Sequence, residues 1–345
     1  MKYRRLHVLI VVLATVAVIG VCLSAALTRL FPTGQPDRSQ IRYEEWMNAI
    51  ADEAKLKEIA IPASHNTGSI DCTLGTTSIP LRWLDCQQDT VYDQLRYGVR
   101  LLDLRTGYDP KSDIVYCVHG TGFGIPLEDA LRDLKRFDET YPGQFYFVSI
   151  SVYGVVQGAP AESMRDLIGR YLPAERVFPA DTDLTDMTIG AMRATGKTFV
   201  LRTDPSWGIE NSTYRMHDTW TGAANSGRTD DNTALFLHLE QELRSASDSE
   251  LLLLSFNRGS GDSLAKELPL DFMLADRAAF LELIDQIESN RQFLSRANFF
   301  NFDYTTYDWV QCASVIGLNL AKNLVRPEFR TAFSATIEQR LAESD

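Results

Sequence analysis

The sequence has little histidine, cysteine or positive charge, and these shortages exclude whole classes of function. Only five histidines and five cysteines occur in 345 residues, with no CxxC pair and no His/Cys cluster along the chain. The spacing therefore does not indicate a structural zinc site. Lys and Arg number 34 against 46 Asp and Glu, so the formal net charge is −12. Because nucleic-acid binding needs a basic footprint, we expect no nucleic-acid partner.

Several signatures of common enzyme classes are also missing. The chain contains no GxSxG nucleophile elbow, no P-loop and no GxGxxG after a first strand, which removes the usual patterns of serine hydrolases and nucleotide-binding enzymes. Hydrophobic residues make up 45% and charged residues 23%, which is ordinary globular composition and excludes disordered or collagen-like chains. The length allows either two domains or one α/β barrel.

Residues 1–30 are typical of a membrane or export segment. Lys2, Arg4 and Arg5 precede a stretch without charge at 8–27, and about 20 such residues span a bilayer core as a helix. This stretch exceeds the roughly 7–15-residue core of a signal peptide, which favours a signal-anchor over a cleaved signal peptide. Because the basic flank comes first, we expect the remainder to be extracytoplasmic, either membrane-anchored or secreted. Proline, glycine and polar residues at 31–40 indicate a linker before a domain at 41–345.

The cysteine count is compatible with an exported domain. Cys72, Cys86, Cys117 and Cys312 follow the apolar segment, and an even number allows two disulfides. We expect Cys72–Cys86 to pair, because that bond closes a short loop. The other two either form a second disulfide or stay as buried thiols.

Short apolar runs alternate with helical patterns through the domain. Strands are predicted at 58–62, 99–105, 114–119, 145–152, 198–203, 213–217, 251–257 and 299–304. Helices are predicted at 43–54, 91–97, 126–140, 161–170, 232–245, 277–292 and 311–322. Strands separated by helices favour parallel βα units. Eight of them in order predict an α/β fold, a (βα)8 TIM-type barrel.

Polar side chains follow several of these strands. His65 and Asn66 follow the first, Asp103 and Arg105 end the second, and His119 ends the third. The carboxyl ends of barrel strands form the face that carries chemistry. Two histidines near one arginine suit acid–base catalysis on an anion, since guanidinium binds phosphate well. A histidine in isolation is more often a hydrogen-bonded structural residue, and Arg105 has Asp103 as an alternative partner.

At these residues the chain resembles the X domain of phosphatidylinositol-specific phospholipases C. The matching blocks are IAIPASHNTGSID, CQQDTVYDQLRYGVRLLDLRTGYD, IVYCVHGTGFGIPLEDAL and YPGQFYFVSIS, in that order, within 56–153. A weaker likeness to bacterial single-domain enzymes continues through KTFVLRTD, RMHDTW, LLLLSFNRGSG and FFNFDYTTYDW. The resemblance implies one irregular barrel for the whole folded part.

The resemblance also implies a role for each matching residue. His65 matches the general base that removes the proton of the inositol 2-hydroxyl, and His119 matches the acid that protonates the diacylglycerol oxygen. Arg105 matches the bacterial arginine at the phosphate. Asp303 is similar to the aspartate that orients the base, and Asp103 to the carboxylate beside the arginine. On a looser alignment, substrate-binding positions fall at Arg202, Asp218 and Trp220.

One position departs from the bacterial pattern. Asn66 stands where bacterial enzymes usually have aspartate, which weakens electrostatic support for His119, whereas in the eukaryotic enzymes an asparagine binds calcium there. Asp103 matches a second calcium ligand, but Arg105 occupies the position of another, and a cation beside a Ca²⁺ site opposes binding. The resemblance therefore implies a metal-independent enzyme without a cofactor, with calcium at Asn66 and Asp103 as the alternative.

The expected activity is a phosphodiesterase or lyase reaction on a membrane phospholipid. Phosphatidylinositol, or a related phosphodiester lipid, would give diacylglycerol and a cyclic inositol phosphate. One alternative is a metal-dependent phosphodiesterase on the same barrel, for which a divalent-ion requirement would be diagnostic. The other is a catalytically inactive module that binds lipid headgroups, for which tight binding without turnover would be diagnostic.

Overall fold

The structure is a computed structural model that describes residues 41–344 except 76, 154–155 and 260–266. The expected signal-anchor or signal peptide at 1–30 and the linker at 31–40 lie outside the described residues, so both stay predictions. Within the described ranges, no helix is both long and apolar enough to cross a membrane.

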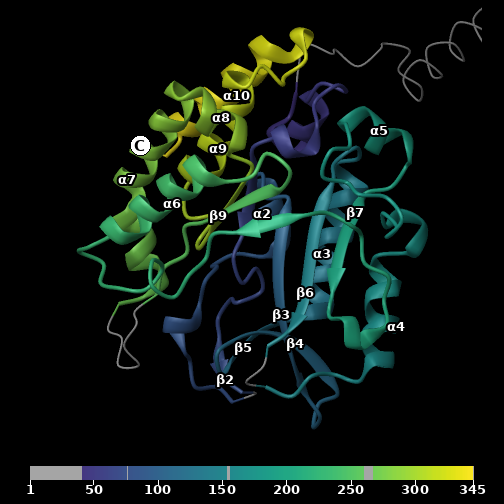
Figure 1. Ribbon diagram of the computed structural model, residues 1–345. Helices are drawn as coiled ribbons and strands as arrows, with labels where there is room; N and C mark the ends of the chain where they lie inside the picture. Colours follow the sequence, from purple (N-terminus) through teal and green to yellow (C-terminus); the bar gives the residue numbers. More distant parts are fainter. Residues whose placement is uncertain (1–40, 76, 154–155, 260–266, 345) are drawn as a thin grey trace, which may run out of the picture. The chain divides into compact units, whose positions relative to one another are not determined.

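Parallel strands form the wall of an α/β barrel (Figure 1). In spatial order they are β8 (Met216–Asp218), β9 (Leu251–Ser255), β10 (Phe299–Phe302), β1 (Ile61–Ser64), β3 (Leu101–Asp109), β6 (Tyr146–Val152) and β7 (Phe199–Thr203). Every ladder between neighbours in this series is parallel, so all carboxyl ends open on one face of the barrel. The α/β class and the barrel-like arrangement are confirmed.

The prediction of eight parallel strands is wrong at one strand. The segment 114–119 forms as β4 (Ile114–His119), but it runs antiparallel to β3 and then pairs with β5 (Gly122–Pro126), whose edge carries β2 (Thr73–Leu74). Only four residues, 110–113, join β3 to β4, whereas a parallel crossover needs a dozen or more. No ladder joins β7 to β8 among the described residues, so the ring of hydrogen bonds is open there.

The first barrel strand starts later than its sequence predicts. Residues Leu56–Glu58 form a short 3₁₀ turn, η2, and β1 follows at Ile61. All four residues of β1 are buried, as expected for a strand of a parallel sheet that is covered on both faces. The shift places His65 directly after the strand.

The helices follow the predicted alternation in most of the domain. Helices close to the predicted ranges are α2 (Val91–Arg96), α3 (Leu127–Thr140), α4 (Ala161–Tyr171), α6 (Thr233–Ser245) and α9 (Val310–Ala321). The predicted helix at 43–54 is instead a 3₁₀ segment, η1 (Tyr43–Ala49). The helix expected at 277–292 begins earlier, as α7 (Pro269–Ser289), with proline at its first position, and α8 (Arg291–Arg296) follows. The predicted ranges include neither α5 (Ile189–Ala194) nor α10 (Arg330–Ala342).

Helices pack on the outside of the strands. In Figure 1, α6, α7 and α9 lie on the side of β9, α8 and α10 lie above them, and α3 and α4 lie on the side of β6 and β7. Aromatic rings fill the barrel interior, where Phe147 and Phe299 meet edge to face with centroids 4.8 Å apart. Burial of one such side chain contributes about 1.5–3 kcal/mol, so packing holds the strand ends in fixed positions.

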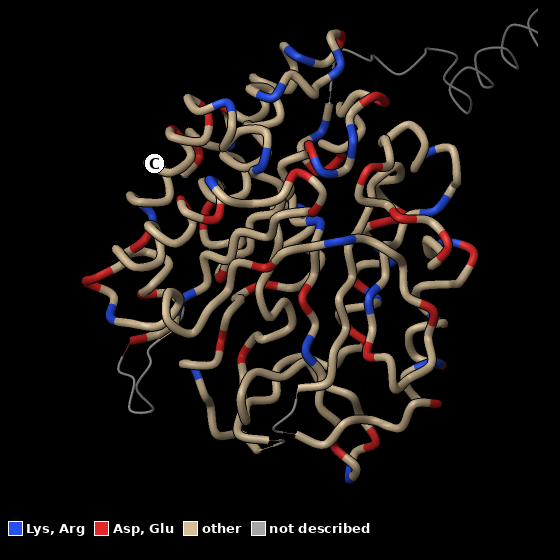
Figure 2. Tube along the Cα trace, in the orientation of Figure 1, with Lys and Arg blue, Asp and Glu red and all other residues tan. Residues whose placement is uncertain are grey.

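Positively and negatively charged residues are interspersed along the described trace (Figure 2). Many form exposed pairs, such as Arg170 with Glu128 at 3.0 Å between α4 and α3. Pairs of this kind contribute about 0–1 kcal/mol each. The charge therefore bears on solubility and association more than on the fold.

Candidate active site

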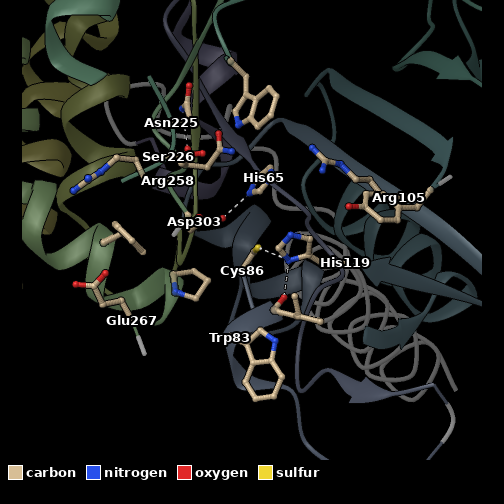
Figure 3. A pocket seen from close by; sticks show the side chains of 17 residues that line it. His65, Trp83, Cys86, Arg105, His119, Asn225, Ser226, Arg258, Glu267 and Asp303 are labelled. Carbon is tan, nitrogen blue, oxygen red and sulfur yellow. Dashed lines mark hydrogen bonds and ion pairs between the residues drawn. The ribbon is translucent and has the colours of Figure 1, made fainter. Parts of the chain in front are cut away.

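A pocket of about 690 Å³ lies at the carboxyl ends of the strands (Figure 3). His65 and His119 lie in the middle of the view, with Arg105 on one side and Arg258 on the other. The residues that line it are His65, Trp83, Leu84, Cys86, Arg105, His119, Tyr153, Trp220, Asn225, Ser226, Asn257, Arg258, Gly259, Glu267, Pro269, Phe272 and Asp303. Its volume falls within the range of small-molecule sites.

His65 and Asp303 form a buried hydrogen-bonded pair. Strands β1 and β10 pair with Ser64 opposite Phe302. The residues that follow the two strands, His65 and Asp303, therefore lie opposite each other. His65 Nδ1 lies 2.7 Å from Asp303 Oδ1, and both residues are buried. The carboxylate accepts the Nδ1 proton, which fixes the ring and leaves Nε2 as the basic atom.

The same pair sets the pKa of His65. Burial is the largest single effect and opposes the charged ring, but Asp303 and Cys86 together outweigh it and raise the pKa of His65 from 6.5 to about 9. Asp303 is the larger of these two contributors, and burial raises the pKa of the Cys86 thiol itself. The imidazolium form of His65 is thus stabilised.

His119 approaches from the β4 hairpin. Its Nδ1 lies 3.0 Å from the carbonyl oxygen of Leu84, which accepts that proton. The ring centroids of His65 and His119 lie 6.1 Å apart at an interplanar angle of 78°. Burial lowers the pKa of His119, so its resting ring is neutral at pH 7. The two imidazoles therefore share one pocket with opposite pKa shifts.

Arg105 lies on the other side of His119. Asp103 and Arg105 are two residues apart on β3, so they face the same way. The Arg105 Nε and Nη2 atoms each lie 3.1 Å from Asp103 Oδ2, and 32% of the Arg105 side chain is exposed. Burial alone would lower the pKa of Arg105, but Asp103 raises it. The guanidinium keeps donors free for an anion in the pocket.

Asn66 supports the site through its backbone. Its φ is 44°, a left-handed conformation that asparagine tolerates, and its N–H donates to Asp103 Oδ2 at 3.3 Å. The amide Nδ2 donates to Cys86 Sγ at 3.5 Å, while Oδ1 is buried without a partner. The Asp103 carboxylate is already occupied by the Arg105 cation, so Asn66 and Asp103 do not fit a calcium ion.

The expected Cys72–Cys86 disulfide is wrong. The cysteines of the described residues are all free and buried. Cys72 Sγ lies 3.2 Å from Ser69 Oγ, whereas Cys86 Sγ lies in the pocket 3.4 Å from His119 Nδ1. A short loop closure does not ensure that two side chains face each other. Sequence reasoning consequently missed Cys86 as a pocket residue.

Of the three looser substrate-binding predictions, Trp220 alone is among the residues that line the pocket. Trp220 lines the pocket and is 51% exposed. Asp218 Oδ1 accepts the Trp220 backbone N–H at 2.9 Å and the Ser255 hydroxyl at 2.7 Å. Arg202 is exposed on β7, with its guanidinium 5.8 Å from the centroid of the Tyr214 ring. Asp218 and Arg202 are not among the lining residues.

Other lining residues were not predicted. Asn257 and Arg258 lie two and three residues past the end of β9, and Arg258 is buried against Asp276 with donor–acceptor distances of 2.6 and 2.7 Å. Asn225 donates to the carbonyl of Asn257 at 2.8 Å, which ties the loop after β8 to this wall. The signal that could have found Asn257 and Arg258 is their place at a strand's carboxyl end.

Comparison with known proteins supports the resemblance seen in the sequence. No family model matches the chain. A 1-phosphatidylinositol phosphodiesterase of Staphylococcus aureus is 30% identical over 108 residues, which is 31% of this chain and 33% of that protein. A variant-surface-glycoprotein phospholipase C of Trypanosoma brucei brucei is 25% identical over 128 residues, 36% of each chain. The resemblance to phosphatidylinositol-specific phospholipases C is therefore confirmed, although the match spans about a third of these relatives.

Solved structures extend the likeness to the whole fold. A phosphatidylinositol-specific phospholipase C from Listeria monocytogenes superposes with a TM-score of 0.64 at 17% identity, covering 81% of this chain and 99% of that one. A variant of the Staphylococcus aureus enzyme gives 0.57 at 19% identity, covering 83% and 98%. At these identities the superpositions show the fold alone.

Proposed function

We propose that this chain cleaves phosphatidylinositol, or a related phosphodiester lipid, to diacylglycerol and a cyclic inositol phosphate. The observation that carries the proposal is the placement of two imidazoles and one guanidinium around a single pocket. His65 and His119 lie with ring centroids 6.1 Å apart, and Arg105 lines the same cavity. A base, an acid and a cation are what phosphodiester cleavage by a neighbouring hydroxyl requires.

His65 acts as the general base in its neutral form, which is the minor form at pH 7 because its pKa is raised to about 9. Its Nδ1 is bonded to Asp303, so Nε2 takes the proton of the hydroxyl next to the phosphate. That oxygen attacks phosphorus, and the bond from phosphorus to the diacylglycerol oxygen breaks. Attack from within the same molecule benefits from a high effective concentration. Asp303 stabilises the imidazolium that forms, as its effect on the pKa of His65 indicates.

His119 acts as the general acid and Arg105 stabilises the phosphate charge. The Leu84 carbonyl holds His119 Nδ1, so Nε2 is the atom that donates to the leaving oxygen. The bound phosphodiester brings negative charge beside His119, which raises its pKa towards the protonated form. Arg105 retains free donors beyond its bond to Asp103 and meets the oxygens on which charge develops.

The rim of the pocket suits a lipid substrate. Trp83 and Trp220 line the pocket, and each is about half exposed, at 50% and 51%. Indole rings favour the interface between water and lipid, because one part of the ring is apolar and its N–H is polar. We infer that they contact the bilayer surface while the headgroup occupies the cavity. Arg202 and Asp218 remain proposed headgroup contacts.

The remaining predictions complete the proposal. We infer that 1–30 is a signal-anchor or signal peptide, that the domain acts on the outer side of a membrane, and that the reaction needs no metal or other cofactor. Asp103 in its ion pair with Arg105 supports the last point, since that pairing opposes a hard cation.

Phosphorus NMR of the full chain with phosphatidylinositol in detergent micelles tests the proposal. We expect a cyclic inositol phosphate signal that is unchanged by a chelator. Turnover lost on chelation would replace this mechanism with a metal-dependent one. Absence of turnover on this lipid and on related headgroups, together with saturable binding, would favour the headgroup-binding module.

A further inference from the structure

The pocket contains three possible metal-ligand side chains, and the proposed reaction uses only two of them. His65, Cys86 and Asp303 each offer a ligand atom, and these three atoms lie within 4.8 Å of one another. All three residues are buried. They come from segments that are far apart in sequence, because the Cys86 carbonyl accepts the Tyr304 N–H at 2.7 Å and so ties the loop before α2 to the end of β10.

The thiol is placed among polar groups in a way that core packing does not require. Cys86 Sγ has His119 Nδ1 at 3.4 Å and Asn66 Nδ2 at 3.5 Å. The buried Oδ1 of Asn66 has no partner, so this corner of the pocket has an unused acceptor beside the thiol. By contrast, Cys117 and Cys312 pack within the apolar core.

The donor types select a class of metal ion. Thiolate, imidazole and carboxylate together suit Zn²⁺, whereas Ca²⁺ and Mg²⁺ prefer oxygen donors alone. Zinc bonds of about 2.0–2.3 Å place tetrahedral ligand atoms roughly 3.3–3.6 Å apart. The three atoms already lie within 4.8 Å, so small side-chain rotations bring them to that spacing. Water then fills the fourth position, as in open zinc sites.

We propose that His65, Cys86 and Asp303 form a zinc-binding site that reversibly switches off catalysis. The ion forms bonds to the Cys86 sulfur, to one His65 nitrogen and to an Asp303 oxygen. The thiol proton and any proton held by the coordinating His65 nitrogen go to solvent, so no redox partner is needed. The ligated imidazole can no longer accept a proton from substrate. Metal binding does not depend on the proposed phosphodiester cleavage, whereas inhibition by the bound metal rests on the proposed function.

Binding is measured first, without any assay of activity. Co²⁺ replaces Zn²⁺ as the probe, because a cobalt–thiolate bond gives a charge-transfer band in the near ultraviolet. The full chain is used in detergent with Cys22→Ser as the background, so that no thiol outside the described domain contributes. We expect one Co²⁺ per chain with this band, and stoichiometric Zn²⁺ should remove it.

Two matched variants decide whether Cys86 is the ligand. Cys86→Ser should abolish the charge-transfer band and weaken Co²⁺ binding at least about 10-fold. Cys72→Ser is the control, because Cys72 lies in the same loop region beside Ser69 but does not line the pocket. It should bind Co²⁺ like the background protein. A band that persists in Cys86→Ser, or is absent in both the background and Cys72→Ser, would overturn the proposal.

The inhibitory effect is measured separately on active protein. Zn²⁺ should lower turnover of phosphatidylinositol by the background protein and by Cys72→Ser, and a chelator should restore it. Cys86→Ser should require at least about 10-fold more Zn²⁺ for the same inhibition. Equal sensitivity of the two variants would contradict control through this site. If neither the background protein nor its variants turn over the lipid, the proposed function is contradicted. The cobalt titration still decides whether the metal site exists.

Discussion

The two halves of the barrel build the pocket in different ways. In the half from β1 to β6, Asp103, Arg105 and the backbone of Asn66 form a tight hydrogen-bonded group. In the half from β7 to β10, Asp218 and Arg202 are exposed, and the wall is made by loops that follow β8 and β9. In the proposed mechanism, the first half fixes the reacting groups, and the second shapes the space around them. Substitutions in the first half should therefore affect the chemical step, and those in the second should affect substrate binding.

The histidine pair should show the largest effect. His65→Ala and His119→Ala should each reduce kcat by about 10²–10⁴-fold, because each removes a proton-transfer group. The two roles separate on a substrate with an acidic leaving group such as a nitrophenol, which needs no general acid. His119→Ala should regain much of its rate on that substrate, and His65→Ala should not. Equal recovery of both variants would contradict the assigned roles, provided that thermal unfolding shows both to be folded.

Arg105 should show the next largest effect. Arg105→Ala should lower kcat by about 10²–10³-fold, because it removes the donors that face the developing phosphate charge. Arg105→Lys should recover only part of this loss, since an ammonium lacks the planar fork of donors. Kinetics on phosphatidylinositol micelles measures both. An unchanged rate, with reduced thermal stability, would show that Arg105 has only a structural role, through its ion pair with Asp103.

Asp303 crosses the boundary between the halves and should show a smaller effect, about 10–10²-fold on kcat, because the base itself remains. Its more specific readout is the pH profile. The carboxylate is the largest of the effects that raise the pKa of His65 to about 9, so in Asp303→Asn that pKa should fall. Because the pKa of the base lies above that of the acid His119, the base sets the alkaline limb of kcat/KM, and that limb should move to lower pH. A profile identical to that of the parent protein would show that Asp303 does not set the charge of His65.

The same pair gives a stability test with a defined sign. The pKa of His65 is higher in the folded protein than its ordinary value of 6.5. The stabilisation of the folded protein by protonated His65 is therefore fully present below pH 6.5 and is lost as the pH rises through about 9. The difference corresponds to about 3 kcal/mol of unfolding free energy at most. Denaturant unfolding of the parent protein should show this loss, and Asp303→Asn should reduce it.

The contrast between the halves also explains what the sequence could predict. His65, Arg105 and His119 lie in short contiguous motifs at strand ends, and the structure brings them into one pocket. The antiparallel course of β4 was missed because an apolar run of six residues has no direction by itself. Only the short turn before it, at 110–113, carried that information.

Long-range placement was beyond the sequence patterns. His65 and Asp303 are 238 residues apart, and the register of β1 with β10 alone brings them to 2.7 Å. The family resemblance supplied that pair, whereas nothing supplied the place of Cys86 in the pocket. Asn257 and Arg258 were missed for another reason. They lie at the carboxyl end of the predicted strand 251–257, so the strand-end signal was present in the sequence and was not used for them.

Arg202 should show the smallest effect, and it provides the matched contrast to Arg105. Both arginines lie on parallel barrel strands, but Arg105 lines the pocket and is fixed by Asp103, whereas Arg202 is exposed above the Tyr214 ring. A hydrogen bond from an exposed cation to a headgroup hydroxyl is weakened by competing water. Arg202→Ala should therefore raise KM by less than about 10-fold and leave kcat unchanged. A loss of kcat as large as that of Arg105→Ala would show that the half from β7 to β10 also contacts the reacting phosphate. The proposed separation of the chemical step from substrate binding between the two halves would then be wrong.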